Sequence, residues 1–371
     1  MKYFNNISIG VFSFIFGTSS IYASNISFLN DVLPDNFRKQ LEINVSQAKF
    51  DESLDVLNYI DNLSGSKPKE ATIDEVSISY KFKNNLKFTF EKTNSSAEIE
   101  RSSIPRSLKT EADSDFYSIS FPILSATNTV FNLEIFGTET EQDPVTIDCY
   151  QFGGTVIGGS CGEADIQLLD SQVYRSTGEI NYIPVLKTQG ISDGYGVTLR
   201  INPINNENFN ISHTLTFGEE EILMSFDSAI LNTTDKFLRG ARVNGITTGE
   251  LLDSFKNDLP QETPWKERYF KYSINSTYGL TENLALSGRL SFVKVTRSNY
   301  QENVLKKDFS NNQVIDLGFF YRPIDNFLIY SRLSLSSNYL LGLTPIAYNR
   351  KSNHLFDHPY GQLYIGTLIS F

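Results

Sequence analysis

The feature of this sequence that most limits its fold is an alternation of apolar and polar residues, repeated in pairs of segments joined by short turns. Residues 76–82 alternate in this way, residues 83–85 have the composition of a turn, and residues 86–90 alternate again. A β-strand points successive side chains to opposite faces, so this pattern predicts a β-hairpin with one apolar face. Four more hairpins are predicted on the same grounds, over residues 117–135, 195–217, 270–292 and 315–335.

The connections differ in length on the two sides of the predicted sheet. Turns within the hairpins are short and rich in Asn, Pro and Asp, whereas longer polar stretches separate one hairpin from the next. Those stretches are residues 97–114, 139–163, 218–266, 297–312 and 338–358. Short turns on one side and long loops on the other are typical of a transmembrane β-barrel, with periplasmic turns and extracellular loops. The sequence therefore predicts an all-β, closed antiparallel transmembrane barrel.

The first residues have the features of a secretory signal. Lys2 precedes an apolar run over residues 7–16, and small residues follow, with a plausible cut after Ala23 or Ser24. No later window is apolar for the roughly 18 residues that a spanning helix needs. We therefore expect a signal peptide at 1–23, an N-terminal segment at 24–72 and an outer-membrane barrel at 73–371, exported through the periplasm.

The strand count depends on two uncertain regions. Residues 41–49 supply a first strand ahead of the hairpins, and residues 164–187 contribute either two strands or none. An antiparallel barrel with both ends periplasmic needs an even number of strands, so the prediction is 14 strands, with 12 as the alternative. Residues 51–65 have the pattern of a short amphipathic helix.

The face opposite the apolar one is polar on nearly every predicted strand. A barrel of 12 or 14 strands is too wide for side chains to fill, so its interior holds water or a plug. Charged rings select ions in pores, and Arg200, Arg289 and Arg332 are predicted at the constriction because each lies in the middle of a strand. The other predicted pore-lining residues are Lys271, Asp316, Glu134, Glu91 and Lys87. The alternative interpretation is that these mixed charges only keep the wall hydrated.

Residues 363–371 are a strand with one mostly apolar face that ends on Phe371. This segment resembles the closing strand of Gram-negative outer-membrane β-barrels, whose assembly machinery recognises such an aromatic end. Together with the signal and the alternation, it makes residues 73–371 similar in pattern to a porin or related barrel. The resemblance implies contacts with outer-membrane lipid and lipopolysaccharide, and leaves a homo-oligomer open.

The width and polar interior of the predicted barrel indicate a porin-like channel for passive diffusion of small polar solutes or ions. Alternatives are a solitary autotransporter-like translocator barrel and a plugged transporter of hydrophobic compounds. Segment 51–65 or loop 218–266 is a candidate plug for the lumen. The net charge of −11 argues against a nucleic-acid partner.

Enzymatic chemistry has weak support, and the sequence predicts no enzyme. The strand residue His213 has no Ser two positions away, as an outer-membrane lipid hydrolase would need. The last loop contains Ser352, His354, Asp357 and His358, which as polar loop residues do not define a protease or metal site. Neither a phosphate-binding loop nor a metal motif is present, so no cofactor is expected. In an exported chain, Cys149 and Cys161 predict a loop disulfide.

Overall fold

The computed structural model describes most of the predicted strands and a short segment ahead of them. The described residues are 25–33, 37–51, 66–101, 104–126, 129–148, 184–205, 209–227, 236–240, 242–243, 246–247, 249–250, 253, 264–299, 311–336 and 360–371. Within these ranges, no helix is both long and apolar enough to cross a bilayer.

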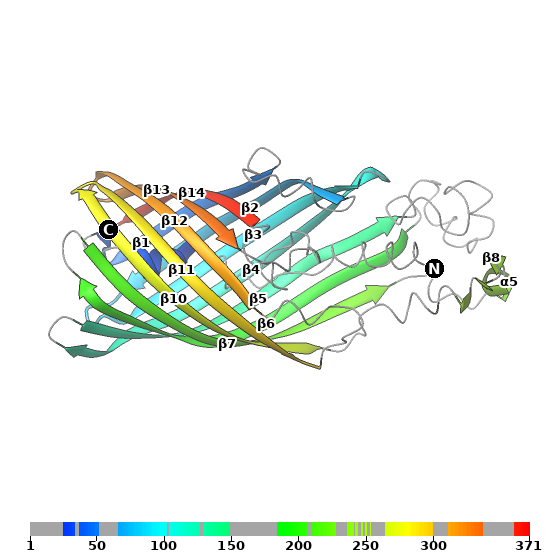
Figure 1. Ribbon diagram of the computed structural model, residues 1–371, viewed down its shortest axis with the longest axis horizontal. Helices are drawn as coiled ribbons and strands as arrows, with labels where there is room; N and C mark the ends of the chain where they lie inside the picture. Colours follow the sequence, from blue (N-terminus) through cyan, green and yellow to red (C-terminus); the bar gives the residue numbers. More distant parts are fainter. Residues whose placement is uncertain are drawn as a thin grey trace.

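Twelve antiparallel strands of the described chain close into a barrel, in which sequence neighbours are also neighbours in space (Figure 1). The first and last strands pair with each other, and Leu41 and Phe371 exchange two backbone hydrogen bonds of 3.1 and 2.8 Å at that junction. The strands are β1 (Leu41–Asp51), β2 (Ser66–Lys81), β3 (Lys87–Arg101), β4 (Ile104–Ala126), β5 (Thr129–Asp148), β6 (Pro184–Asn205), β7 (Phe209–Asp227), β10 (Trp265–Thr281), β11 (Leu284–Ser298), β12 (Asn311–Ile324), β13 (Phe327–Ser336) and β14 (Tyr360–Ser370).

The prediction of 14 strands is wrong, and the barrel has 12. The two extra strands were expected within residues 164–187, between β5 and β6. Instead, β5 pairs directly with β6 from Val130↔Asn202 to Asp148↔Pro184. Because this pairing uses the facing edges of both strands, no strand can be inserted between them. The weak alternation of residues 164–187 in the sequence does not reveal which strands pair with each other.

Several stretches predicted as loops are strands in the structure. The pairing of β3 with β4 continues to Arg101↔Ile104, which turns most of the expected loop 97–114 into a hairpin. β5 and β7 also continue into the expected loops, to Asp148 and Asp227. The extensions of β3, β4 and β5 are mostly polar because they lie beyond the apolar belt of the barrel, and polar strands in water have the composition of loops. The extension of β7 also contains the apolar residues 222–224.

The outer surface has an apolar belt near the short turns. Its exposed side chains include Val76, Ile78, Phe88, Phe90, Ile119, Ile135, Val197 and Phe217. Further along the strands the outward residues become polar, and the change is marked by tyrosines whose hydroxyls donate to carboxylates, Tyr117 to Glu139 and Tyr195 to Glu219. An apolar band bordered by aromatic residues is the surface that a bilayer requires.

Two small elements come from the long connection between β7 and β10. They are helix α5 (Lys236–Gly240) and the hairpin of β8 (Arg242–Val243) with β9 (Ile246–Thr247). Figure 1 shows them beyond the end of the barrel opposite the short turns, so the described part of loop 218–266 does not enter the lumen. Of the other predicted plug, 51–65, only Asp51 is described, as the last residue of β1.

The lumen contains a segment that the sequence did not single out, the helix α2 (Asn25–Val32). Six of its eight residues are buried. Its apolar side chains join two groups of inward-facing wall residues. Ile26 belongs to one with Phe116, Phe136, Tyr269, Val293 and Val295. Phe28, Leu29 and Val32 belong to the other, with Ala285, Phe320, Leu328, Tyr330 and Leu368.

Candidate functional site

Helix α2 crosses the lumen from one wall to the opposite wall. Its first residue contacts Ser46 and Glu75, on β1 and β2. Its last two residues contact Ser212 and Thr277, on β7 and β10, half-way round the ring of strands. All these wall residues lie within a few positions of the short turns. The helix therefore crosses the barrel at the level of the apolar belt, where a pore would have its constriction.

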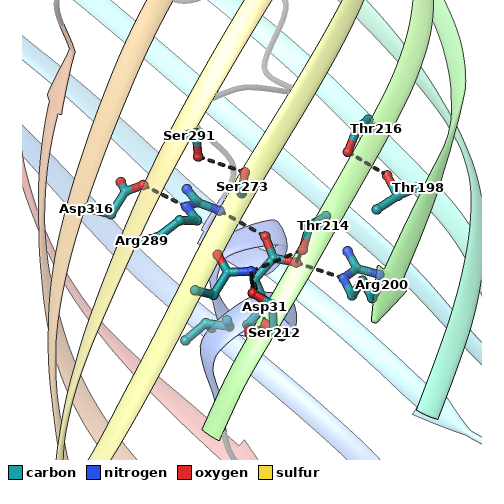
Figure 2. A network of polar contacts seen from close by, with 12 residues as sticks. Asp31, Thr198, Arg200, Ser212, Thr214, Thr216, Ser273, Arg289, Ser291 and Asp316 are labelled. Atoms are coloured by element: carbon teal, nitrogen blue, oxygen red, sulfur yellow. Dashed lines mark hydrogen bonds and ion pairs between the residues drawn. The ribbon is translucent and has the colours of Figure 1, made fainter. Parts of the chain in front are cut away.

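Asp31 fixes the carboxyl-terminal end of α2 to three strands, β6, β7 and β11. Its Oδ1 accepts hydrogen bonds from Arg200 Nε at 2.8 Å and Thr214 Oγ1 at 3.2 Å, and its Oδ2 accepts one from Arg289 Nη1 at 3.3 Å (Figure 2). Burial alone raises the pKa of the Asp31 carboxyl, but the charges of Arg200, Arg289 and Lys271 more than offset this effect. The pKa of Asp31 therefore lies below its ordinary value, and the side chain is a carboxylate at neutral pH.

The ion pairs of Asp31 belong to a longer chain of charges around the wall. Asp316 bridges Arg289 and Arg332, with separations of 2.7 and 2.8 Å. On the other side, Arg200 contacts Glu134 at 2.6 Å. In this chain of contacts, three wall arginines face two wall carboxylates, and Asp31 on the helix supplies a third negative charge. Because a buried charge is costly unless it is paired, Asp31 favours the docked helix by giving Arg200 and Arg289 a second carboxylate partner.

The amino-terminal end of α2 faces acidic residues. The backbone N–H of Asn25 donates to Glu75 Oε2 at 3.3 Å, and that of Ile26 donates to Glu91 Oε2 at 3.2 Å. The side-chain amide of Asn25 donates to Ser46 and accepts from Arg332, each at 2.8 Å. Carboxylates are favourable at a helix amino terminus and cations at its carboxyl terminus. The charges of the two walls therefore match the dipole of the helix that lies between them.

Phe28 is the central apolar contact of the helix. Its ring is fully buried, packs on Phe320 with centroids 6.2 Å apart, and lies under the guanidinium groups of Arg289 and Arg332 at 5.1 and 4.8 Å. Gly318 on β12 leaves space for this ring and for a neighbouring wall hydroxyl, since a Cβ there would lie 2.8 Å from Phe28 Cζ and 2.3 Å from Ser287 Oγ. The wall therefore has a fitted socket for this one side chain.

Residues after the helix bind its carboxyl-terminal end. Arg38 donates to the carbonyl oxygens of Leu29 and Leu33 and to Asn30 Oδ1, which also accepts from Lys87 at 3.0 Å. Both cations also contact Glu42 on β1, Arg38 at 3.3 Å and Lys87 at 2.8 Å. The Leu29 carbonyl also accepts a hydrogen bond from the backbone N–H of Leu33 at 2.9 Å, so Arg38 adds a second donor to it. Carbonyl groups at a helix end lack a partner within the helix, and for the Leu33 carbonyl, just past that end, Arg38 is the donor.

The structure places all eight residues that were predicted to line a pore. Five of them, Arg200, Arg289, Arg332, Asp316 and Glu134, form the chain of ion pairs with Asp31. Glu91 binds the amino-terminal end of α2 and Lys87 its Asn30, while Lys271 is buried on β10. A pore-lining role for these residues remains a prediction, since their contacts are with a helix.

Sequence reasoning missed α2 and its residue Asp31. The available signal was the spacing of Ile26, Leu29 and Val32, which falls on one side of a helix. That spacing begins directly after the predicted signal cleavage site, in a segment assigned only a strand and a helix at 51–65. Asp31 was overlooked because its partners Arg200 and Arg289 are 169 and 258 positions away.

The remaining predicted sites are not assembled in the described residues. Cys149, Cys161 and the last-loop residues Ser352, His354, Asp357 and His358 lie outside them, and no disulfide or metal-ligand cluster occurs within them. The predicted disulfide thus remains a prediction. His213 accepts or donates a hydrogen bond of 2.9 Å with the Tyr272 hydroxyl.

The closed barrel, its apolar belt and its polar interior give this protein the fold of outer-membrane β-barrel proteins. No protein-family model and no curated protein match the sequence. Among solved structures, the translocator domain of the autotransporter NalP from Neisseria meningitidis is similar, with a TM-score of 0.51 and 10% identity, over 93% of this chain and 92% of that one.

Two other solved barrels are less similar. The NanC porin has a TM-score of 0.42 and 7% identity, over 89% of this chain and 100% of its own. The toluene transporter TodX of Pseudomonas putida has a TM-score of 0.41 and 10% identity, over 96% of both chains. At these identities the likeness concerns the fold.

Proposed function

We propose that this protein is an outer-membrane channel for small polar solutes or ions, and that helix α2 is its gate. The observation that carries the proposal is the position of Asp31, which joins a helix in the lumen to the wall arginines Arg200 and Arg289. This proposal modifies the passive pore expected from the sequence in one respect. The lumen through which solutes would pass contains a helix whose charges match those of the polar wall.

The connectivity of α2 suits a movable element. The helix precedes β1 in the chain, and β1 begins at the end of the barrel where the short turns lie. The helix forms no strand pair, so it can leave toward that end without breaking the hydrogen bonds of the barrel. An isolated helix of eight residues is not stable in water, so its helical form depends on the contacts with the wall.

Single-channel conductance in planar bilayers tests this proposal. We expect the refolded protein to conduct rarely and a variant lacking residues 25–32 to conduct steadily, with a preference among ions set by the uncovered arginines. The matched control is a variant lacking residues 236–240, which deletes helix α5 outside the barrel and is expected to behave like the unaltered protein. Equal, steady conductance of the unaltered protein and of the variant lacking residues 25–32 would contradict the gate.

A solitary autotransporter-like translocator is the second candidate, because a helix within the lumen is what that function would require. The similarity of the fold to the NalP translocator domain is compatible with it. An epitope placed directly before Asn25 in the processed chain separates the two functions. Antibody binding to intact cells would favour the translocator, whereas an epitope accessible only after the outer membrane is permeabilised would favour the gated channel.

A further inference from the structure

Between α2 and the short turns lies a cavity of about 380 Å³, which we call the vestibule. Its inner wall is formed by Asn30, Asp31 and Leu33, and the exposed residues Lys81 and Asn85 lie at its outer edge. The vestibule therefore opens toward the periplasmic side of the barrel. Its volume is within the range of sites that bind small molecules.

The charges around the vestibule are unequal. Its cationic lining residues are Arg38, Lys39, Lys81, Lys87 and Arg200, and its acidic lining residues are Asp31 and Glu42. The lining that the structure describes thus has an excess of positive charge. A concave surface of one sign with walls of low dielectric concentrates ions of the opposite sign.

Each of the two carboxylates already forms ion pairs with two cations. Glu42 Oε2 contacts Lys87 at 2.8 Å and Arg38 at 3.3 Å, and it also experiences the charge of Lys81. Asp31 is committed to Arg200 and Arg289. Lys81 forms no ion pair with any described residue, so one carboxylate, Glu42, is left to balance four cations, Arg38, Lys39, Lys81 and Lys87.

We propose that the vestibule is a binding site for a small organic anion that carries carboxylate or phosphate groups and enters from the periplasm. The anionic group lies beside Glu42, among Lys81, Lys87 and Arg38. The neutral amides of Asn132, Asn202 and Asn210 on the cavity wall supply further donors for its polar groups. This inference deepens the proposed function, and it rests on that function only in using the docked helix as the inner wall.

Substitutions at two residues of the vestibule lining should change anion affinity in opposite directions. Lys81→Gln removes a cation and weakens binding, whereas Glu42→Gln removes the competing carboxylate and strengthens it. For one charge that acts through the water of an open cavity, we expect changes of about fivefold in each direction. Lys92→Gln is the matched control, because Lys92 is an exposed lysine outside the vestibule, paired with Asp113 at 3.5 Å.

Isothermal titration calorimetry of the refolded protein in an uncharged detergent, at physiological salt, tests the site with succinate and inorganic phosphate as probes. We expect saturable binding of both anions, none of neutral succinamide, and the opposite shifts for Lys81→Gln and Glu42→Gln. The proposal is overturned if neither anion binds saturably, or if Lys92→Gln weakens binding as much as Lys81→Gln. Absence of binding in a protein that passes the conductance test would refute the vestibule site and leave the gate intact.

Discussion

Replacing Asp31 with Asn is the smallest change that should release α2. The side chain keeps its shape and one oxygen acceptor but loses its charge. Of its contacts with the two arginines, one becomes a hydrogen bond from the charged guanidinium to a neutral amide oxygen, and the other is lost. Hydrogen bonds to charged groups contribute about 1.5–3 kcal/mol, so losing one of them and weakening the other should weaken docking by roughly 2–3 kcal/mol.

This estimate is below the roughly 3–5 kcal/mol that isolating a buried charge costs. Arg200 keeps Glu134 at 2.6 Å and Arg289 keeps Asp316 at 2.7 Å, so neither arginine is left without a carboxylate. A change of 2–3 kcal/mol shifts the equilibrium between docked and released helix by roughly 30- to 150-fold.

Single-channel recording measures this shift as the open probability of Asp31→Asn relative to the unaltered protein. Asp253→Asn is the control, since Asp253 pairs with Arg239 at 2.5 Å outside the barrel and should leave the open probability unchanged. If a folded Asp31→Asn barrel opened no more often than the unaltered protein, the contacts of Asp31 would not hold a gate.

Two further predictions concern the socket and the acid dependence of the gate. Gly318→Ala places a methyl group 2.3 Å from Ser287 Oγ on the wall and 2.8 Å from Phe28 Cζ on the helix. The Ser287 hydroxyl can rotate away, whereas the ring must move, and because overpacking costs about 1–3 kcal/mol, the open probability should rise about tenfold. Gly288→Ala, whose nearest neighbour would be 3.7 Å away, should change nothing; an equal effect of both variants would exclude the socket. The pKa of Asp31 is lowered in the docked state, so its contribution to docking is complete above the ordinary value of 3.8 and is lost as pH falls through the lowered value. Open probability should therefore rise below that ordinary value, and an Asp31→Asn variant that retained the same acid-induced rise would assign it to another group.

The barrel was predictable from the sequence because a strand has a period that local residues reveal. The alternation around Tyr80 and Phe88 indicates both a hairpin and its apolar face. The same kind of alternation on β11 and β12 places Arg289 and Asp316 on the polar face. The number of strands was not predictable, because pairing of β5 with β6 is a property of distant segments. The polar extensions of β3 and β4 have the composition of a loop, because outside the bilayer both faces of a strand are in contact with water.

Only the wall residues of the candidate site could be predicted from the sequence. The wall residues Arg200, Arg289 and Asp316 follow from strand periodicity, but their partner Asp31 does not. A helix of eight residues gives a weak local signal, and α2 is stabilised by the wall rather than by its own propensity. Its position could be found only from the complementary charges of segments far apart in the chain.

The central claim is that α2 is docked across the lumen in the resting protein. Hydrogen–deuterium exchange of the refolded barrel tests it directly, through the peptide that contains residues 25–33. We predict that this peptide exchanges slowly in the unaltered protein and much faster in Asp31→Asn, while peptides from β11 and β12 stay protected in both. Fast exchange of residues 25–33 in the unaltered protein, beside protected barrel strands, would contradict the account.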